Sequence, residues 1–124
     1  MNECRCRFGY FHILNNDYSE WEMYAIGGSA NPTILSQGNR FMASTNSFVK
    51  EVTKRQNAKE NEWKNWNWRS EDDVLLNGAY FTQSGSRESS AYATAYSMRP
   101  KSSAVVGDLT RNAGVLSCKK GNHC

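Results

Sequence analysis

The sequence predicts an all-β solenoid, in which short strands wind into coils that stack on one another. The first observation behind this prediction is a repeat, in which an apolar run leads to an asparagine and an aromatic residue follows two positions later. The repeat occurs at Asn16 with Tyr18 and, 23 residues on, at Asn39 with Phe41. One asparagine in each period of the low twenties is typical of stacked coils, whose asparagine side chains can bond one another and satisfy the backbone of a bend.

Two further observations support the solenoid. A looser third pass of the repeat covers residues 74–81, VLLNGAYF, with Asn77 in the place of the asparagine. Only 39% of the residues are hydrophobic, and the chain is rich in asparagine, serine and glycine, which suits strands and turns better than a helical bundle. Three ordinary strand–turn units, in which asparagine is only a turn former, remain the alternative interpretation.

The predicted elements follow in chain order. Residues 8–16 are rich in aromatic and apolar side chains and predict a first strand, which an Asn-Asn-Asp turn ends. Residues 21–26 predict a second strand that stops at two consecutive glycines. A short strand at 33–35 follows the turn before it, and Gly38 allows a sharp bend just before Asn39.

Residues 42–73 are interpreted as an insertion that loops out between coils, because their charged stretch shows no apolar face. Three tryptophans near its far end need burial, so this part is expected to pack against the body of the protein; an aromatic platform for a sugar is the alternative. They are Trp63, Trp66 and Trp68. The whole chain, residues 1–124, is thus predicted to be part of one domain, with coils at 7–41 and 74–81 and a tail at 82–124 along the outside.

Charge and hydropathy exclude some classes of function. A net charge of +3 permits an acidic ligand but lacks the dense basic stripe of nucleic-acid binders. No run approaches the ~18 apolar residues of a membrane span. The first residues also lack the apolar core of a secretory signal peptide. Neither nucleic acid nor a membrane is therefore an expected partner.

The four cysteines lie at the two ends of the chain. Cys118 and Cys124 enclose a loop that is expected to close as a small disulfide; a zinc site with the neighbouring His123 is the alternative, but this cysteine spacing is not a standard one for structural zinc. Cys4 and Cys6 are too close for an easy bridge with each other. Disulfide-type cysteines without an export signal predict a chain whose upstream part is missing.

These same segments resemble the C-terminal part of the plant pectate lyases and the related pollen allergens. The resemblance runs in order through RFGYFHILNNDYSEWEMYAIGGSANPTILSQGNRF, EVTKR, WKNWNWRSEDD, LLNGAYF and NAGVLSC. It implies a right-handed parallel β-helix and calcium-dependent cleavage of pectate, the de-esterified (1→4)-α-D-galacturonan, by β-elimination. It also implies that the protein is secreted to the cell wall.

The resemblance also assigns roles to residues. The family's catalytic base is the first arginine of a motif that reads Arg, any residue, Pro, any two, Arg. Aligned on this chain, the base position holds Asn2, the proline position holds Cys4, and the last arginine is Arg7, which by resemblance contacts substrate carboxylate together with Arg5. Asparagine cannot act as this base, so no catalytic residue is expected in this chain.

The resemblance places the family's calcium ligands upstream of Met1, so no metal-binding residue is predicted here. The aspartates present fit no calcium-loop spacing and are expected to be solvated turn carboxylates. They are Asp17, Asp72, Asp73 and Asp108. Because the base and the calcium ligands are missing, the chain is expected to be inactive alone.

Parts of the sequence also suit two other functions. The first is a non-catalytic binder of acidic polysaccharide, which would use Arg5, Arg7, Arg40 and the tryptophan cluster. The second is a leucine-rich-repeat interaction module, which would share the period and the asparagine. The chain lacks the leucine spacing that such repeats require.

Overall fold

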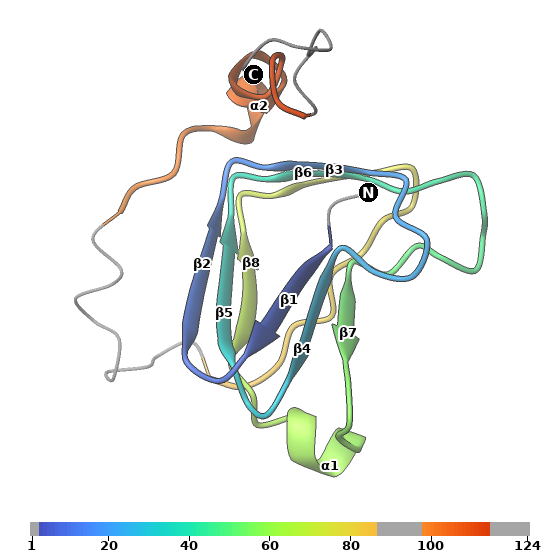
Figure 1. Ribbon diagram of the computed structural model, residues 1–124, viewed down its shortest axis with the longest axis vertical. Coiled ribbons are helices and arrows are strands. Elements are labelled where there is room, and N and C mark those ends of the chain that lie inside the picture. Colours follow the sequence, from blue (N-terminus) through green and yellow to red (C-terminus); the bar gives the residue numbers. More distant parts are fainter. Residues whose placement is uncertain (1–2, 87–97, 115–124) are drawn as a thin grey trace, which may run out of the picture.

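The computed structural model describes residues 3–86 and 98–114, and in it the chain winds through three coils of parallel strands (Figure 1). The first coil contains β1 (Cys4–Arg7), β2 (Tyr10–Leu14) and β3 (Asp17–Ser19). The second contains β4 (Ile26–Ser29), β5 (Thr33–Gln37) and β6 (Arg40–Met42). The third contains β7 (Thr53–Arg55), the short helix α1 (Glu60–Trp63), β8 (Trp68–Glu71) and β9 (Val74–Leu76).

Strands in equivalent places of successive coils pair in parallel and form three sheets, ordered β1-β4-β7, β2-β5-β8 and β3-β6-β9. In the view of Figure 1 these sheets are three sides of a triangular coil. This architecture confirms the predicted all-β parallel β-helix. The leucine-rich-repeat interpretation is wrong, because all three sides of a coil carry strands.

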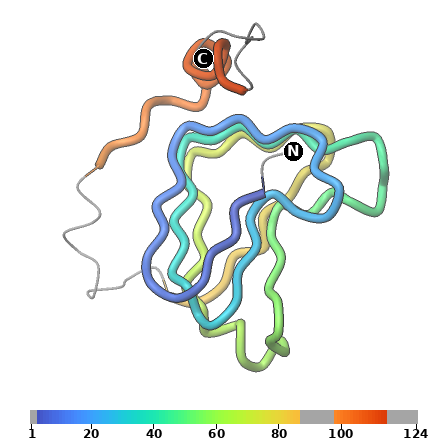
Figure 2. The backbone as a smooth tube through the Cα atoms, in the orientation of Figure 1, coloured from blue at the N-terminus to red at the C-terminus, as the bar shows by residue number. Residues whose placement is uncertain are grey.

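The pairing register confirms the repeat found in the sequence. Tyr18 pairs with Phe41, an offset of 23 residues, and their rings stack with centroids 5.1 Å apart. The next turn is longer, because Phe41 pairs with Leu75, an offset of 34 residues. The extra residues of the third coil lie in the connections before β7 and between β7 and β8, as the tube in Figure 2 shows.

The corner between the second and third strand of each coil is a two-residue bend. Its first residue has a left-handed backbone in all three coils, with φ of 52° at Asn15, 64° at Gly38 and 53° at Asp72. Asparagine, glycine and aspartate tolerate this conformation better than other residues, which is why these types recur at the corner. A Cβ on Gly38 would also lie 2.6 Å from the carbonyl oxygen of Lys101, so the position has no room for a side chain.

The second residues of the three bends are joined by hydrogen bonds into a ladder that runs from coil to coil. Its members are Asn16, Asn39 and Asp73. Asn39 is fully buried, and its side-chain oxygen accepts from the backbone N–H of Asn16 at 2.8 Å. Its amide nitrogen donates to the carbonyl of Ile13 at 2.9 Å and to Oδ1 of Asp73 at 3.0 Å. The ladder therefore satisfies backbone groups that the bends leave without a strand partner.

The third position of the ladder is Asp73, and the prediction that Asn77 occupies it is wrong. The apolar run before Asn77 is β9, which pairs with β6 and so follows the bend instead of preceding it. Asn77 lies after β9, where its amide donates to the carbonyl of Ala43 at 2.9 Å. Asp73 is consequently a ladder member and not a solvated turn carboxylate. Burial raises the pKa of Asp73, against the lowering effect of its hydrogen bonds.

One strand prediction needs correction, and one strand was missed. The second strand was expected to end at the glycines, but β4 begins at Ile26 and runs through both of them. Residues 21–25 belong instead to the connection from β3 to β4, where Trp21 and Tyr24 are buried. Glycine is suited to both positions because neighbouring side chains occupy the space that a Cβ atom would need. Tyr24 lies against Gly27, and Trp68 and Pro32 lie against Gly28. A strand at β1 was not predicted.

Residues 42–73 are not wholly an insertion, since they supply β7 and β8 to the stacked sheets. Only the connections around these strands leave the coil. The packing interpretation holds for Trp66 and Trp68, which are 7% and 0% exposed. The indole N–H of Trp68 donates to the carbonyl of Pro32 at 3.1 Å, which fixes β8 against the second coil. Trp68 therefore offers no platform for a sugar.

The described part of the tail runs outside the coils (Figure 1). It contains a 3-10 turn (Ser103–Val105) and the short helix α2 (Val106–Leu109). Lys101 is tied to the first bend by two hydrogen bonds with the Asn15 side chain, at 2.7 and 2.9 Å. In the ranges 3–86 and 98–114, no helix is long and apolar enough to cross a membrane.

The ladder generates a prediction about pH. The pKa of Asp73 is higher in the folded chain than in the unfolded chain. Stability is therefore lost as pH rises from the pKa of Asp73 in the unfolded chain through its pKa in the folded chain. An Asp73→Asn variant keeps an oxygen for Asn39 and a donor for Ser70 but carries no charge to desolvate. We expect it to be more stable than the natural chain at neutral pH and to lack this loss, as measured by urea unfolding at several pH values.

Asp72→Asn is the matched control, because Asp72 is the exposed neighbour and asparagine tolerates its left-handed backbone equally well. It should change stability little at any pH. An Asp73→Asn variant less stable than the natural chain at neutral pH would show that the charge strengthens the ladder more than desolvation weakens it.

Candidate functional site

The outer face of the β1-β4-β7 sheet carries the two arginines singled out in the sequence. Side chains alternate along an extended strand, so Cys4 and Cys6 of β1 point into the coil while Arg5 and Arg7 point out. Both arginines are exposed. One strand thus presents two guanidinium groups to solvent on the same side.

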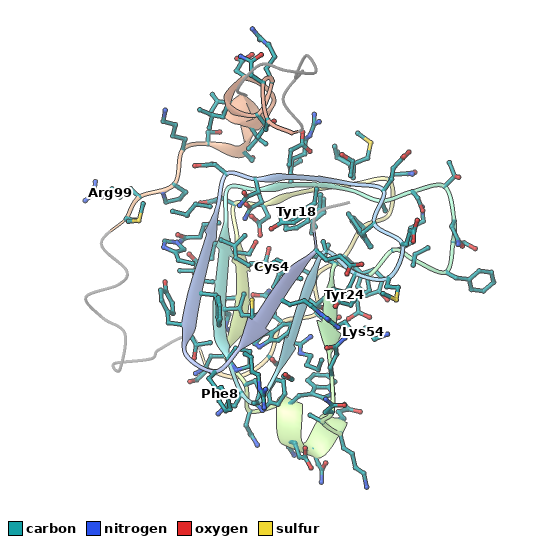
Figure 3. All side chains as sticks on the ribbon, in the orientation of Figure 1. Cys4, Phe8, Tyr18, Tyr24, Lys54 and Arg99 are labelled. Atoms are coloured by element: carbon teal, nitrogen blue, oxygen red, sulfur yellow. The ribbon has the colours of Figure 1, made fainter. Side chains whose placement is uncertain are left out.

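A row of residues crosses this face from coil to coil. Arg5 pairs with Gly27, and Gly27 pairs with Lys54. Adjacent strands lie ~4.8 Å apart, so the two cations of the row are separated by about two strand spacings. Lys54 is exposed, and Figure 3 shows it on the same outer side as Tyr24.

Tyr24 fills the space between these two cations. An ideal Cβ on Gly27 would lie 2.4 Å from Cε2 of the Tyr24 ring, so the ring rests directly on the glycine backbone. Tyr24 is only 1% exposed, and its hydroxyl accepts from Nε of Arg5 at 3.0 Å. The contact leaves the two terminal nitrogens of the Arg5 fork for a ligand and fixes the direction in which they point.

A hollow of about 220 Å³ lies over this part of the sheet, and Arg5, Arg7, Ser29 and Gln56 are among its lining residues. None of the described residues that line it carries a carboxylate. Arg7 also lies over the exposed Phe8 ring, with its guanidinium carbon 5.1 Å from the ring centroid. The arrangement can hold an anion with planar, paired oxygens, which is the geometry that guanidinium groups bind best.

A second hollow, of about 340 Å³, lies at the Lys54 end of the row. The half-exposed Tyr80 and the side chains of Glu51 and Thr82 are among its lining residues. The Glu51 carboxylate accepts from the hydroxyls of Thr53 at 3.0 Å and Thr82 at 2.6 Å. This hollow therefore mixes one acid with cations, unlike the arginine-lined hollow beside it.

The structure separates Arg40, the third predicted cation, from this face, and the neighbouring Arg55 does not belong to it either. Arg40 belongs to the β3-β6-β9 sheet and forms an ion pair with Asp17 at 2.6 Å, which raises the pKa of Arg40. Arg55 points the other way from Lys54, and its guanidinium lies 4.1 Å from the Trp68 ring centroid. Burial lowers the pKa of Arg55 to about 10. Arg40 and the tryptophans are thus not part of the arginine face, which is the outer surface of the β1-β4-β7 sheet around Arg5, Arg7, Tyr24, Gly27 and Lys54.

The calcium implied by the family resemblance does not fit the described residues. In the ranges 3–86 and 98–114, no group of three or more His, Cys, Asp or Glu side chains could hold a metal ion. Asp17 is paired with Arg40, Asp73 belongs to the ladder, and Asp108 pairs with Arg111.

Three predicted site residues lie outside the described residues: Asn2, Cys118 and Cys124. The disulfide between the two C-terminal cysteines stays a prediction. Two residues of the arginine face were missed by sequence reasoning, Tyr24 and Lys54. The signal available for Tyr24 was the pair of glycines shortly after it, since a glycine inside a strand often marks a close approach of another group.

Comparison with known proteins gives consistent matches over nearly the whole chain. A protein-family model described as "Pectate lyase" matches residues 2–118. A protein named "Pectate lyase" from Zinnia elegans is 62% identical over 120 residues, which is 97% of this chain and 30% of that protein. "Probable pectate lyase 22" from Arabidopsis thaliana is also 62% identical, over 97% of this chain and 28% of its own length.

A solved structure matches the fold. The crystal structure of Jun a 1, the major allergen from cedar pollen, is 45% identical to this chain and superimposes with a TM-score of 0.79. The match covers 91% of this chain and 33% of the allergen. The chain thus spans about 30% of the length of the curated relatives it matches.

The contact between Tyr24 and Arg5 can be tested without a ligand. Tyr24→Phe keeps the ring on Gly27 but removes the hydroxyl that accepts from Arg5. We expect the Nε–H of Arg5, followed by NMR, to exchange faster with water, while the melting temperature changes little. Gly27→Ala should displace the ring and cost about 1–3 kcal/mol of stability, as overpacking does.

Tyr80→Phe is the control, because it removes a hydroxyl from a half-exposed ring at the other hollow. It should leave the Arg5 signal unchanged. Equal exchange of the Arg5 Nε–H in the natural chain and in Tyr24→Phe would contradict the positioning role.

Proposed function

The chain belongs to the pectate lyase family, and on that basis we propose that the hollow on its arginine face binds the galacturonate units of pectate; Arg5, Arg7, Gly27, Ser29 and Gln56 are among the residues that line this hollow. The reaction served is the calcium-dependent β-elimination that cleaves (1→4)-α-D-galacturonan. The site of action is the cell wall, to which proteins of this family are secreted.

The observation that carries this proposal is a hollow with two cations and no acid among its described lining residues. Pectate presents one carboxylate on every sugar. A guanidinium group pairs with a carboxylate through two parallel hydrogen bonds, which gives both energy and orientation. Arg5 is oriented by Tyr24 and Arg7 stands beside it on the same strand, so consecutive carboxylates of a chain can be held along the face.

The same cations suit the chemistry of elimination. The reaction removes the proton on C5 of a galacturonate, and the glycosidic oxygen leaves from C4. Because that proton is weakly acidic, positive charge on the adjacent carboxylate must stabilise the negative charge that develops. Arg7 and Arg5 contribute such charge. In this family calcium contributes more of it, but the described residues of this chain do not form a site for that ion.

A second candidate function is binding of acidic polysaccharide without cleavage. It is favoured by Asn2, which stands at the base position of the family motif and cannot take up the C5 proton. Both candidates use the arginine face, and they differ only in whether an unsaturated product forms.

Binding to pectate tests the proposal directly. Replacing Arg7 by Gln removes a charge-assisted hydrogen bond, and a loss of about 1.5–3 kcal/mol corresponds to at least a tenfold weaker affinity for oligogalacturonate in calorimetry. Arg5→Gln should act in the same direction. Binding by the natural chain should also weaken as salt screens the charges.

Arg111→Gln is the matched control, since Arg111 is an exposed arginine beside α2 that pairs with Asp108. It should bind like the natural chain. Equal binding of oligogalacturonate and its fully methyl-esterified form would contradict recognition of carboxylates by this face.

Cleavage is a separate prediction. With calcium and polygalacturonate at alkaline pH, the 124-residue chain by itself should give no rise in ultraviolet absorbance from unsaturated uronide, because Asn2 occupies the base position and the described residues form no metal site. Turnover of ~1 per second or more, an ordinary enzymatic rate, would show that another group serves as the base.

A further inference from the structure

Cys4 and Cys6 lie next to each other on the inner face of β1, directly behind the arginine face. Their Sγ atoms are 3.4 Å apart, and both cysteines are free thiols. Figure 3 shows Cys4 pointing into the coil, on the side opposite to Tyr24 and Lys54. The proposed function uses neither of these thiols.

The two thiols are not equivalent. Cys4 is partly exposed, whereas Cys6 is 2% exposed within the hydrophobic core. The two sulfurs are hydrogen-bonded to each other, and this contact lowers the pKa of Cys4 to about 7. The same contact, together with burial, raises the pKa of Cys6. Cys4 thus has the accessibility and thiolate character of an attacking sulfur, and Cys6 is placed to attack it in turn.

We propose that Cys4 and Cys6 are an oxidation site that closes to a reversible disulfide within β1. The Cys4 thiolate attacks one oxygen of hydrogen peroxide, breaks the O–O bond and becomes a sulfenic acid, while hydroxide leaves and takes up the proton that the Cys4 thiol has lost to become water. The Cys6 sulfur then attacks the Cys4 sulfur, forms the S–S bond and releases water. Overall, two thiols and one hydrogen peroxide give one disulfide and two water molecules.

The geometry explains why such a bridge is reversible. The sequence predicts that Cys4 and Cys6 are too close for an easy bridge, but residues two apart in an extended strand have Cα atoms ~6.6 Å apart, which is just inside the upper limit for a disulfide. The sulfurs must approach from 3.4 Å to about 2.05 Å, and bringing the Cα atoms to the ~5.5–6 Å usual for a disulfide shortens the strand around Arg5, which lies between the two cysteines. A bridge that pulls on a paired strand is easily reduced by ordinary dithiols.

Closure also has a consequence for the arginine face, and this step rests on the proposed function. Arg5 is enclosed by the ring of the disulfide, and its contact with Tyr24 depends on the extended shape of β1. Shortening the strand moves Arg5 away from the Tyr24 hydroxyl. Oxidised protein is therefore expected to bind pectate less tightly than reduced protein.

Peptide mapping tests the bridge. The Cys118→Ser/Cys124→Ser variant of the full chain leaves only Cys4 and Cys6, and trypsin cuts after Arg5 and after Arg7. After treatment with hydrogen peroxide and blocking of free thiols, we expect residues 1–5 and 6–7 to appear as one disulfide-linked pair in mass spectrometry. Dithiothreitol should separate them and restore both thiols.

A further Cys6→Ser change in that background is the matched variant. It retains Cys4 but lacks the second sulfur, so peroxide should leave a sulfenic acid on Cys4 that a dimedone probe captures. Separately oxidised cysteines, or disulfides between two chains in place of the linked pair, would overturn the proposal. Circular dichroism of each variant checks that the chain is folded.

Pectate binding before and after oxidation tests the consequence. About a tenfold loss of affinity, reversed by dithiothreitol, is expected if closure costs Arg5 one charge-assisted hydrogen bond. Unchanged affinity would overturn the link to the arginine face. The two proposals can fail separately, because peptide mapping needs no pectate. A natural chain that binds no pectate would refute the proposed function, whereas absence of the linked peptide pair would refute the disulfide.

Discussion

The stacking of coils in register is the constraint on which the rest of this structure depends. Each strand pairs only with its equivalents above and below, so every corner must turn at the same place in each coil. The ladder of Asn16, Asn39 and Asp73 meets this requirement at one corner by bonding coil to coil. The fully buried Asn39 satisfies groups on both neighbouring coils, which makes that corner intolerant of a shift in register.

The register of the strands also decides which side chains face the core and which face solvent. In β1 the inner side chains are two cysteines that join the core and the outer ones are two arginines that face solvent. Because side chains alternate, any change in the length of β1 acts on both sets at once. This coupling is the physical basis for relating the thiols to the arginine face.

The geometry of the arginine face depends on a glycine as well as on its cations. Gly27 lies between Arg5 and Lys54, and the missing side chain lets the Tyr24 ring lie on the backbone. The buried hydroxyl of that ring then orients Arg5. Parallel strands ~4.8 Å apart set Arg5 and Lys54 at a fixed separation without any specialised loop.

The sequence by itself determined the solenoid and its 23-residue offset, because the ladder asparagines and the aromatics after them are local requirements. The family followed from the resemblance of its segments to the plant pectate lyases. That resemblance also singled out Arg5 and Arg7, which the structure places on the outer side of β1. Only the tertiary structure decided that Asp73 and not Asn77 completes the ladder, that β7 and β8 belong to the coils, and that Tyr24 covers Gly27. These features depend on which residues pair across an offset that lengthens to 34 in the third coil, and no local pattern encodes that pairing.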